Sequence, residues 1–153
     1  MVSIGSSAFG YCYRLTDVSI PDSVTFIGVS AFGDCENLTR VSIPDSVTTI
    51  EQLTFFGCRK LTDVGIPTSV TNIGACAFDG CYNLTDVYYG GSEQQWEQIE
   101  IDDYLNGNSE LLEAVIHSNS ALPNDIPAAG FIAVAASVAV VMVLAVMLKK
   151  RKH

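Results

Sequence analysis

Histidine and basic residues are scarce in this sequence. It contains two His and eight Lys or Arg against 17 Asp or Glu, which gives a formal net charge of −9 at pH 7. All of the acidic residues lie at or before Asp125, whereas half of the basic ones lie in Lys149–Lys152. Nucleic-acid binding requires Lys and Arg to neutralise phosphates. The acidic body therefore excludes DNA and RNA as expected partners.

Residue sets that support catalysis or metal binding are also missing. The two histidines are His117 and His153, so no Cys–His or Ser–His–Asp set can form around a repeat. Cys76 and Cys81 lack both the spacing and the His partners of a zinc site. The sequence has no glycine-rich phosphate-binding loop. We therefore expect no enzymatic activity, no metal and no cofactor.

A sequence repeat of constant length occupies the N-terminal part of the chain. Its copies start at Ile4, Ile27, Ile50 and Ile73, and the fourth copy breaks off. The apolar positions that recur are, in the second copy, Ile27, Phe32, Cys35, Leu38, Val41, Ile43 and Val47. A fixed period of this length predicts a solenoid, in which each coil buries its apolar side chains against the next.

Each copy has the same local pattern. Residues 17–20 alternate polar and apolar side chains and precede Pro21, which predicts a short strand. Val24–Ile27 is rich in β-branched residues and predicts a second extended piece. Within Gly28–Cys35, the residues expected to point inward are Ala31, Phe32 and Cys35. Their spacing of three to four predicts one helical turn.

The recurring pattern LxxVxIPxSVTxIGxxAFxxCxN resembles the leucine-rich repeats of BspA-like, Treponema pallidum-type, surface proteins. This resemblance implies an α/β leucine-rich repeat right-handed solenoid, mainly β, with one short strand and one helical turn per repeat. About four repeats, the first truncated, would occupy residues 1–89. The third copy departs from the pattern at Glu51, Thr54 and Gly65, and we expect it to be the least regular.

Four of the five cysteines follow the repeat period: Cys12, Cys35, Cys58 and Cys81. This periodicity favours a ladder of buried thiols, because free Cys fills small apolar spaces well. A disulfide between coils stays open as the alternative, since neighbouring coils would bring the thiols within about 5 Å.

Residues 90–117 are predicted to cap the last coil. Ser92 and Gln95 have the spacing of a capping box that starts a short helix. Trp96 is expected to plug the open core, with a ligand platform as the alternative. Leu111–His117 is predicted to be a closing strand. The segment is similar to the terminal units of related bacterial surface proteins.

The C-terminal part indicates a membrane anchor. Residues 118–127 form a polar linker with two Pro, and residues 128–148 carry no charge. As a helix the uncharged stretch would span about 31 Å, the thickness of a bilayer core. The basic tail 149–153 would stay cytoplasmic and place the repeats outside the cell. These segments resemble a cell-wall sorting signal of which only Leu122–Pro123 is kept, so we expect a retained single-pass anchor in the lipid bilayer.

The start of the sequence has no basic stretch followed by an apolar core and a small-residue cleavage site, so we expect no secretory signal peptide and an incomplete first repeat. Met1–Ser3 correspond to the middle of a coil, and Ile4, Phe9 and Leu15 would be open to water. We expect the chain to be the C-terminal piece of a longer protein or a truncated product.

Candidate binding residues are the outward positions of the predicted strands. They are Asp17, Ser19, Arg40, Ser42, Asp63, Asp86 and Tyr88. Tyr88 is the best candidate for an anchor, because aromatic residues often dominate interfaces. The alternative is a solvated polar face without a ligand.

The resemblance implies a membrane-anchored cell-surface protein that mediates protein binding or adhesion through its strand face. The partner would be a protein on a host or neighbouring cell. The alternative function is that of a passive spacer, or a truncated remnant of a longer surface protein with no binding role of its own.

Overall fold

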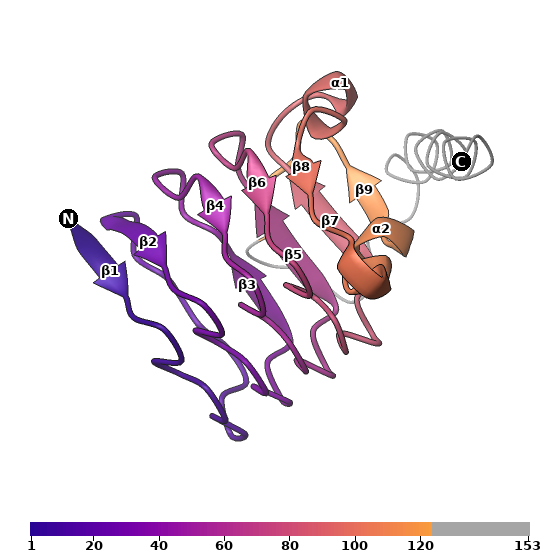
Figure 1. Ribbon diagram of the computed structural model, residues 1–153. Coiled ribbons are helices and arrows are strands. Elements are labelled where there is room, and N and C mark those ends of the chain that lie inside the picture. Colours follow the sequence, from indigo (N-terminus) through magenta and orange to yellow (C-terminus); the bar gives the residue numbers. More distant parts are fainter. Residues whose placement is uncertain (124–153) are drawn as a thin grey trace.

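The computed structural model describes residues 1–123, which form a solenoid of stacked coils (Figure 1). Among the described residues every strand pairing is parallel, and the coils after the first contribute short strands to two sides of the stack. One side holds β1 (Val2–Ile4), β2 (Val24–Ile27), β4 (Thr49–Ile50), β6 (Asn72–Ile73) and β8 (Glu100–Ile101). The other side is a single sheet of β3 (Arg40–Ser42), β5 (Asp63–Ile66), β7 (Asp86–Tyr89) and β9 (Val115–His117).

The short strand predicted in every copy forms as β3, β5 and β7 in the second to fourth copies. At residues 17–20 of the first copy it is not formed, and there the prediction is wrong. The neighbouring coil contacts this edge through Thr39, whose backbone N–H and hydroxyl both donate to the Thr16 carbonyl at 3.1 Å. Leu15 and Val18 are only partly buried. The first coil packs on one side alone, so its outer segment lacks the second neighbour that holds β5 and β7 in place.

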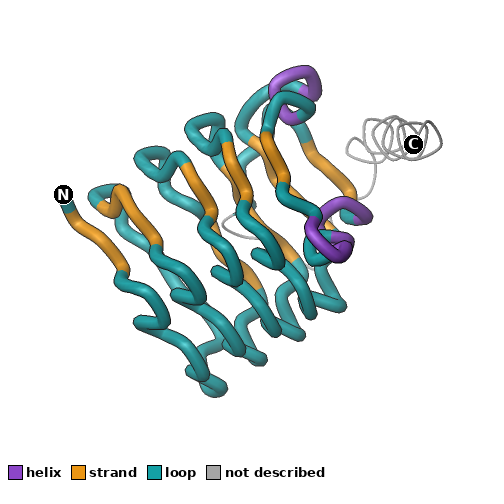
Figure 2. The backbone as a smooth tube through the Cα atoms, in the orientation of Figure 1, coloured by secondary structure: helices purple, strands orange, loops and turns teal. Residues whose placement is uncertain are grey.

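The predicted helical turn in each repeat is also wrong. Within the described residues, helices occur only from Glu93 onward (Figure 2). Residues 28–35 instead form consecutive turns in which Ser30 and Asp34 have positive φ angles of 53° and 56°. The equivalent residues of the other copies also have positive φ: Ser7 and Tyr11, Leu53 and Gly57, Cys76 and Gly80. This side of each coil therefore repeats the same backbone conformation, in which two residues have φ angles in the left-handed region.

Hydrogen bonds between coils explain why a helix does not form there. The N–H groups of Ser30, Phe32 and Asp34 donate to carbonyls of the next coil at 3.2, 2.9 and 2.6 Å. A helix would use these N–H groups internally and leave neighbouring coils without backbone links on this edge. The stack thus has a third ladder, along its turn edge, in addition to its two strand sides.

The core follows the predicted period. Phe9, Phe32, Phe55 and Phe78 stack with ring centroids 5.2, 5.6 and 5.4 Å apart. The Ile, Leu and Val positions of the second and third copies are almost fully buried around this column. The third copy is as regular as the second, so the prediction of irregularity is wrong. Its buried Thr54 is accommodated because its hydroxyl donates to the Glu51 carbonyl at 2.6 Å.

The cysteines form the predicted thiol ladder, and all five are free. The Sγ atoms of Cys35, Cys58 and Cys81 donate to Phe carbonyls of the preceding coil at 3.1, 3.2 and 3.1 Å. Burial raises the pKa of Cys35 to about 12. The hydrogen bond with Cys58, together with burial, raises the pKa of Cys81. The thiols of Cys35 and Cys81 therefore stay neutral and act as hydrogen-bond donors inside the core.

Residues 90–117 add one longer coil to the stack. It contains α1 (Glu93–Trp96), η1 (Tyr104–Asn106) and α2 (Ser109–Glu113), and its strands β8 and β9 extend both sides. The predicted capping box is present between Ser92 and Gln95. Trp96 is 6% exposed and meets the Tyr89 ring edge-on at 5.4 Å. The closing strand is shorter than predicted, because Leu111 belongs to α2.

Two side chains of the cap replace the coil that would follow on the turn edge. Asn108 is completely buried, and its Oδ1 accepts from the Phe78 N–H at 3.2 Å. The Glu110 carboxylate accepts from the Gly80 N–H at 3.2 Å. In the earlier coils, backbone carbonyls accept from the equivalent N–H groups. The third ladder is thus terminated by side chains.

The predicted transmembrane helix at 128–148 and the tail at 149–153 lie outside the described residues. Among residues 1–123, no helix has the length and apolar character needed to cross a membrane.

Candidate functional site

We call the outward side chains of β3, β5, β7 and β9 the strand face. The pairing places its residues in rows that run along the stack. Arg40, Asp63 and Asp86 share one row. Ser42, Gly65, Tyr88 and His117 share the next. The structure therefore brings five of the seven predicted site residues onto one sheet, while Asp17 and Ser19 continue the face beyond β3 as exposed residues without a strand.

A groove of about 410 Å³ opens over the N-terminal part of this face. Four predicted site residues line it, namely Asp17, Ser19, Arg40 and Ser42. Asp22 and Asp45 add further carboxylates to the lining. A single guanidinium thus faces several acidic groups, so the groove has the electrostatics to accept a ligand that carries positive charge.

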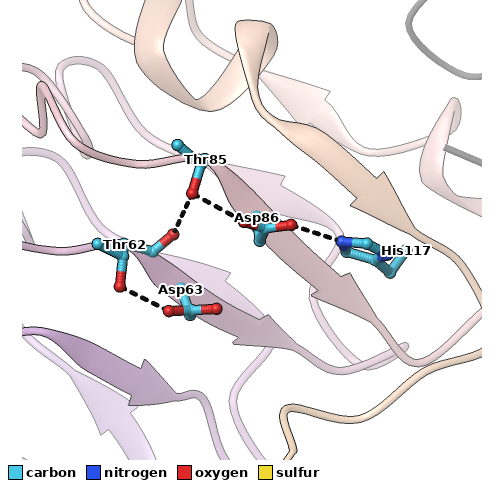
Figure 3. Close-up of polar contacts among 5 residues, drawn as sticks. All are labelled: Thr62, Asp63, Thr85, Asp86 and His117. Carbon is cyan, nitrogen blue, oxygen red and sulfur yellow. Dashed lines mark hydrogen bonds and ion pairs between the residues drawn. The ribbon is translucent and has the colours of Figure 1, made fainter. Parts of the chain in front are cut away.

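Threonines fix the two aspartates of the face (Figure 3). The hydroxyl of Thr62 donates to Asp63 Oδ2 at 2.6 Å, and that of Thr85 donates to Asp86 Oδ2 at 2.7 Å. Thr62 and Thr85 also contact the carbonyl of the threonine one coil earlier. Each carboxylate is therefore held in a defined orientation on the surface of the sheet, although both side chains are only half-buried.

His117 lies on the strand face beside Asp86, a contact that sequence reasoning missed. Its Nε2 is 2.7 Å from Asp86 Oδ1, as Figure 3 shows. The register of β9 creates this pair, and β9 follows a coil that does not obey the period of the repeats. No sequence signal marks the residue, because its position relative to Asp86 depends on the length of the cap.

Tyr88 stacks on His117 with ring centroids 4.6 Å apart, and it is 9% exposed. Burial raises the pKa of its hydroxyl, and the carboxylates of Asp86 and Asp63 raise it further. The phenol is therefore neutral at physiological pH. In this structure Tyr88 is a packed member of the row, with a small fraction of its surface left for a ligand.

The start of the predicted linker crosses the strand face. We call residues 119–123 the strap. The N–H groups of Asn119 and Ser120 donate to the carbonyls of Gly91 and Tyr89 at 2.7 and 3.0 Å. At the other end, Arg40 Nη1 donates to the Pro123 carbonyl at 3.2 Å. The strap therefore runs from the cap back toward β3, and sequence reasoning missed it.

The acidic side chains and the histidine of the described part do not have the geometry of a metal site. Within residues 1–123, no group of His, Cys, Asp and Glu side chains is arranged to hold a metal ion. The imidazole of His117 and the carboxylate of Asp86 contact each other across two neighbouring strands. Their evident effect is to join β9 to β7.

Comparison with known proteins assigns the family. A family model described as a BspA type leucine-rich repeat region matches residues 2–124, in six copies. The chain belongs to the BspA-type leucine-rich repeat family. Leucine-rich repeat proteins of this kind are typically structural or binding domains. No curated protein is significantly similar to the chain.

Solved structures of leucine-rich repeat proteins are similar to this one. A leucine-rich repeat protein from Bacteroides ovatus ATCC 8483 shares 40% identity at a TM-score of 0.55, over 57% of this chain and 22% of that chain. A leucine rich cell surface protein from Faecalibacterium prausnitzii A2-165 shares 33% identity at a TM-score of 0.54, over 65% of this chain and 32% of that chain. The leucine rich repeat protein of T. pallidum shares 29% identity at a TM-score of 0.58, over 80% of this chain and 64% of that chain. The chain thus spans between about a fifth and two thirds of these relatives.

Proposed function

We propose that this BspA-type protein is held at the cell surface and binds a protein ligand of a host or neighbouring cell through its strand face. The observation that carries the proposal is the in-register rows of polar side chains on one parallel sheet. These rows lead into the groove lined by Asp17, Ser19, Arg40 and Ser42. The similarity to a leucine rich cell surface protein supports the location.

The physical basis of recognition is hydrogen bonding and charge complementarity along the coils. The threonine contacts orient the carboxylates of Asp63 and Asp86 before any ligand arrives, which lowers the entropy lost on binding. Arg40 supplies the guanidinium of the face and is half-buried. A ligand that contacts several coils would sum many small interactions over the sheet.

Anchoring through residues 128–148 is the second part of the proposal. The length of this uncharged stretch and the basic residues 149–152 support it. The repeats would then be extracellular, where the strand face can meet another cell. Fractionation of cells that express the full chain, with protease added from outside, tests this location. Repeats that stay in the soluble cytoplasmic fraction would contradict it.

Attachment of cells that display the full chain tests the ligand-binding part. Asp17→Ala, Arg40→Ala and Asp63→Ala together should reduce attachment to host-cell monolayers at least about tenfold, if each contact contributes about 0.5–1 kcal/mol. The matched control replaces Glu36, Arg59 and Glu97, which removes the same charges away from the strand face. Unchanged attachment in the first variant, with a folded protein, would favour the passive spacer instead.

A further inference from the structure

Gly65 makes a notch in the strand face at the position where neighbouring coils carry a side chain. Its register partners are Ser42 on β3 and Tyr88 on β7. Glycine weakens a strand, and its presence there often marks the close approach of another segment. In this structure the approaching segment is the strap, because Leu122 lies directly over Gly65.

The fit between Gly65 and Leu122 is tight. A Cβ placed on Gly65 would lie 3.1 Å from the Leu122 Cβ and 3.0 Å from Ser42 Oγ. Even an alanine would therefore force Leu122 or Ser42 to move. Around Leu122, a remaining space of about 100 Å³ is lined by Ser42, Gly65 and Tyr88 together with the strap itself. The notch therefore accommodates a branched apolar side chain of the size of leucine.

The hydrogen bonds that hold the strap use its backbone and do not depend on its particular sequence. Asn119 and Ser120 use their backbone N–H groups, and Pro123 uses its carbonyl. Leu122 supplies the one side chain that occupies the notch. Any extended segment with a Leu-sized residue, followed by a carbonyl that Arg40 can reach, would meet the same requirements.

We infer that the strand face contains a docking track for an extended apolar peptide segment, and that the strap occupies this track as an intramolecular stand-in. This inference rests on the proposed function and specifies its ligand. A protein ligand with a Leu-like residue must displace the strap before it reaches Gly65. Because the strap is tethered, its effective concentration is on the order of millimolar. A strap bound nine-tenths of the time would weaken the apparent affinity of a ligand about tenfold.

Amide hydrogen exchange of the full-length chain tests whether the strap is docked as described. Leu122→Gly removes the side chain from the notch, and Gly65→Ala adds a methyl group that competes with Leu122 for it, because the new carbon would lie 3.1 Å from the Leu122 Cβ. Both variants should speed exchange at the Asn119 and Ser120 amides about tenfold relative to the wild type. Gly5→Ala is the matched control, because a Cβ there meets no atom within 4 Å. Exchange at these two amides that is equal in all four proteins would overturn the inference.

Peptide binding tests the track itself. The probe is a free peptide of residues 118–123. Its binding to the full-length chain is measured through the chemical shifts of the backbone amides of Ser42 and residue 65. Leu122→Gly should bind the probe up to about tenfold more tightly than the wild type does. Gly65→Ala places a methyl group in the notch and should bind the probe more weakly than Leu122→Gly does. Equal affinity for Leu122→Gly and the wild type, or no binding to Leu122→Gly, would overturn the inference.

These measurements use no cells, so they separate the inference from the proposed function. If the exchange and peptide-binding results are as expected while the cell-attachment test of the proposed function is negative, the track exists but adhesion is not its role. If attachment is identical for the wild type, Leu122→Gly and Gly65→Ala, the ligand binds elsewhere, and the inference about the ligand is wrong even where adhesion is right.

Discussion

Replacement of Asn108 by Ala is expected to destabilise the capped end of the solenoid by about 3 kcal/mol. The Asn108 side chain is completely buried and makes three hydrogen bonds. Its loss leaves the Phe78 N–H without an acceptor, which costs about 1–3 kcal/mol. The Asp102 carbonyl loses its donor at 2.6 Å, at a further cost of about 1 kcal/mol. The Gly74 carbonyl keeps the Ala77 N–H and adds little.

Replacement of Asn108 by Asp separates hydrogen bonding from shape. A carboxylate can still accept from Phe78, but its second oxygen would face the carbonyls of Gly74 and Asp102. Burial and these oxygens should raise the carboxyl pKa of the new side chain above its unfolded value of about 3.9. A raised pKa means that stability is present below the unfolded pKa and is lost as pH rises through the folded pKa. The Asp variant should therefore be closer to the wild type at pH 4 than at pH 7.

Urea unfolding measures the loss of stability, and an unchanged m-value checks that the same transition is compared. Hydrogen exchange at the Phe78 amide reports the loss locally. Asn83→Ala is the control, since this exposed side chain makes one bond, to the Arg59 carbonyl at 2.6 Å. It should cost no more than about 1 kcal/mol. A loss below about 1 kcal/mol in Asn108→Ala, with Phe78 exchange unchanged, would refute the reasoning that side chains terminate the third ladder.

Three further outcomes are expected. Phe55→Ala should lower the free energy of unfolding by about 3–5 kcal/mol in urea titrations, because the ring is fully buried in the aromatic column. Stability should fall between pH 9 and about 12, since the pKa of Cys35 is raised from 9.0 to about 12 in the fold; Cys35→Ala should show a shallower fall in circular-dichroism titrations. In hydrogen exchange, the Phe9 amide should exchange at least about tenfold faster than that of Phe55, because Phe9 is 38% exposed on a coil packed on one side.

The sequence predicts the stacking of coils well, because the constant repeat length determines which residues of neighbouring coils lie side by side. One constant step relates Ile27 to Ile50 and Ile73, and the strand register follows the same step, as in the pairing of Arg40 with Asp63 and of Asp63 with Asp86. Each predicted ladder of like side chains requires only that neighbouring coils have equal length. That condition can be read from the chain without any knowledge of conformation.

Local conformation on the turn edge could not be predicted in the same way. Ala31, Phe32 and Cys35 have the spacing of a helical turn, and the same spacing also suits consecutive turns with positive φ at Ser30 and Asp34. The two conformations bury the same side chains. They differ in where the backbone N–H groups bond, and that choice depends on the adjacent coil, which no pattern within a single repeat contains.

The departures of the third copy carry more information about the strand face than the repeats themselves. Thr54 and Gly65 are expected from the sequence to make the coil irregular, yet the hydroxyl of Thr54 is satisfied locally and Gly65 provides the notch under Leu122. Glycine weakens a strand, and inside a strand it often marks the close approach of another segment, which here is the strap. The strap has no period and its register is invisible in the sequence. Its docking position is nevertheless marked by the one place where the surface row of the described strands lacks a side chain.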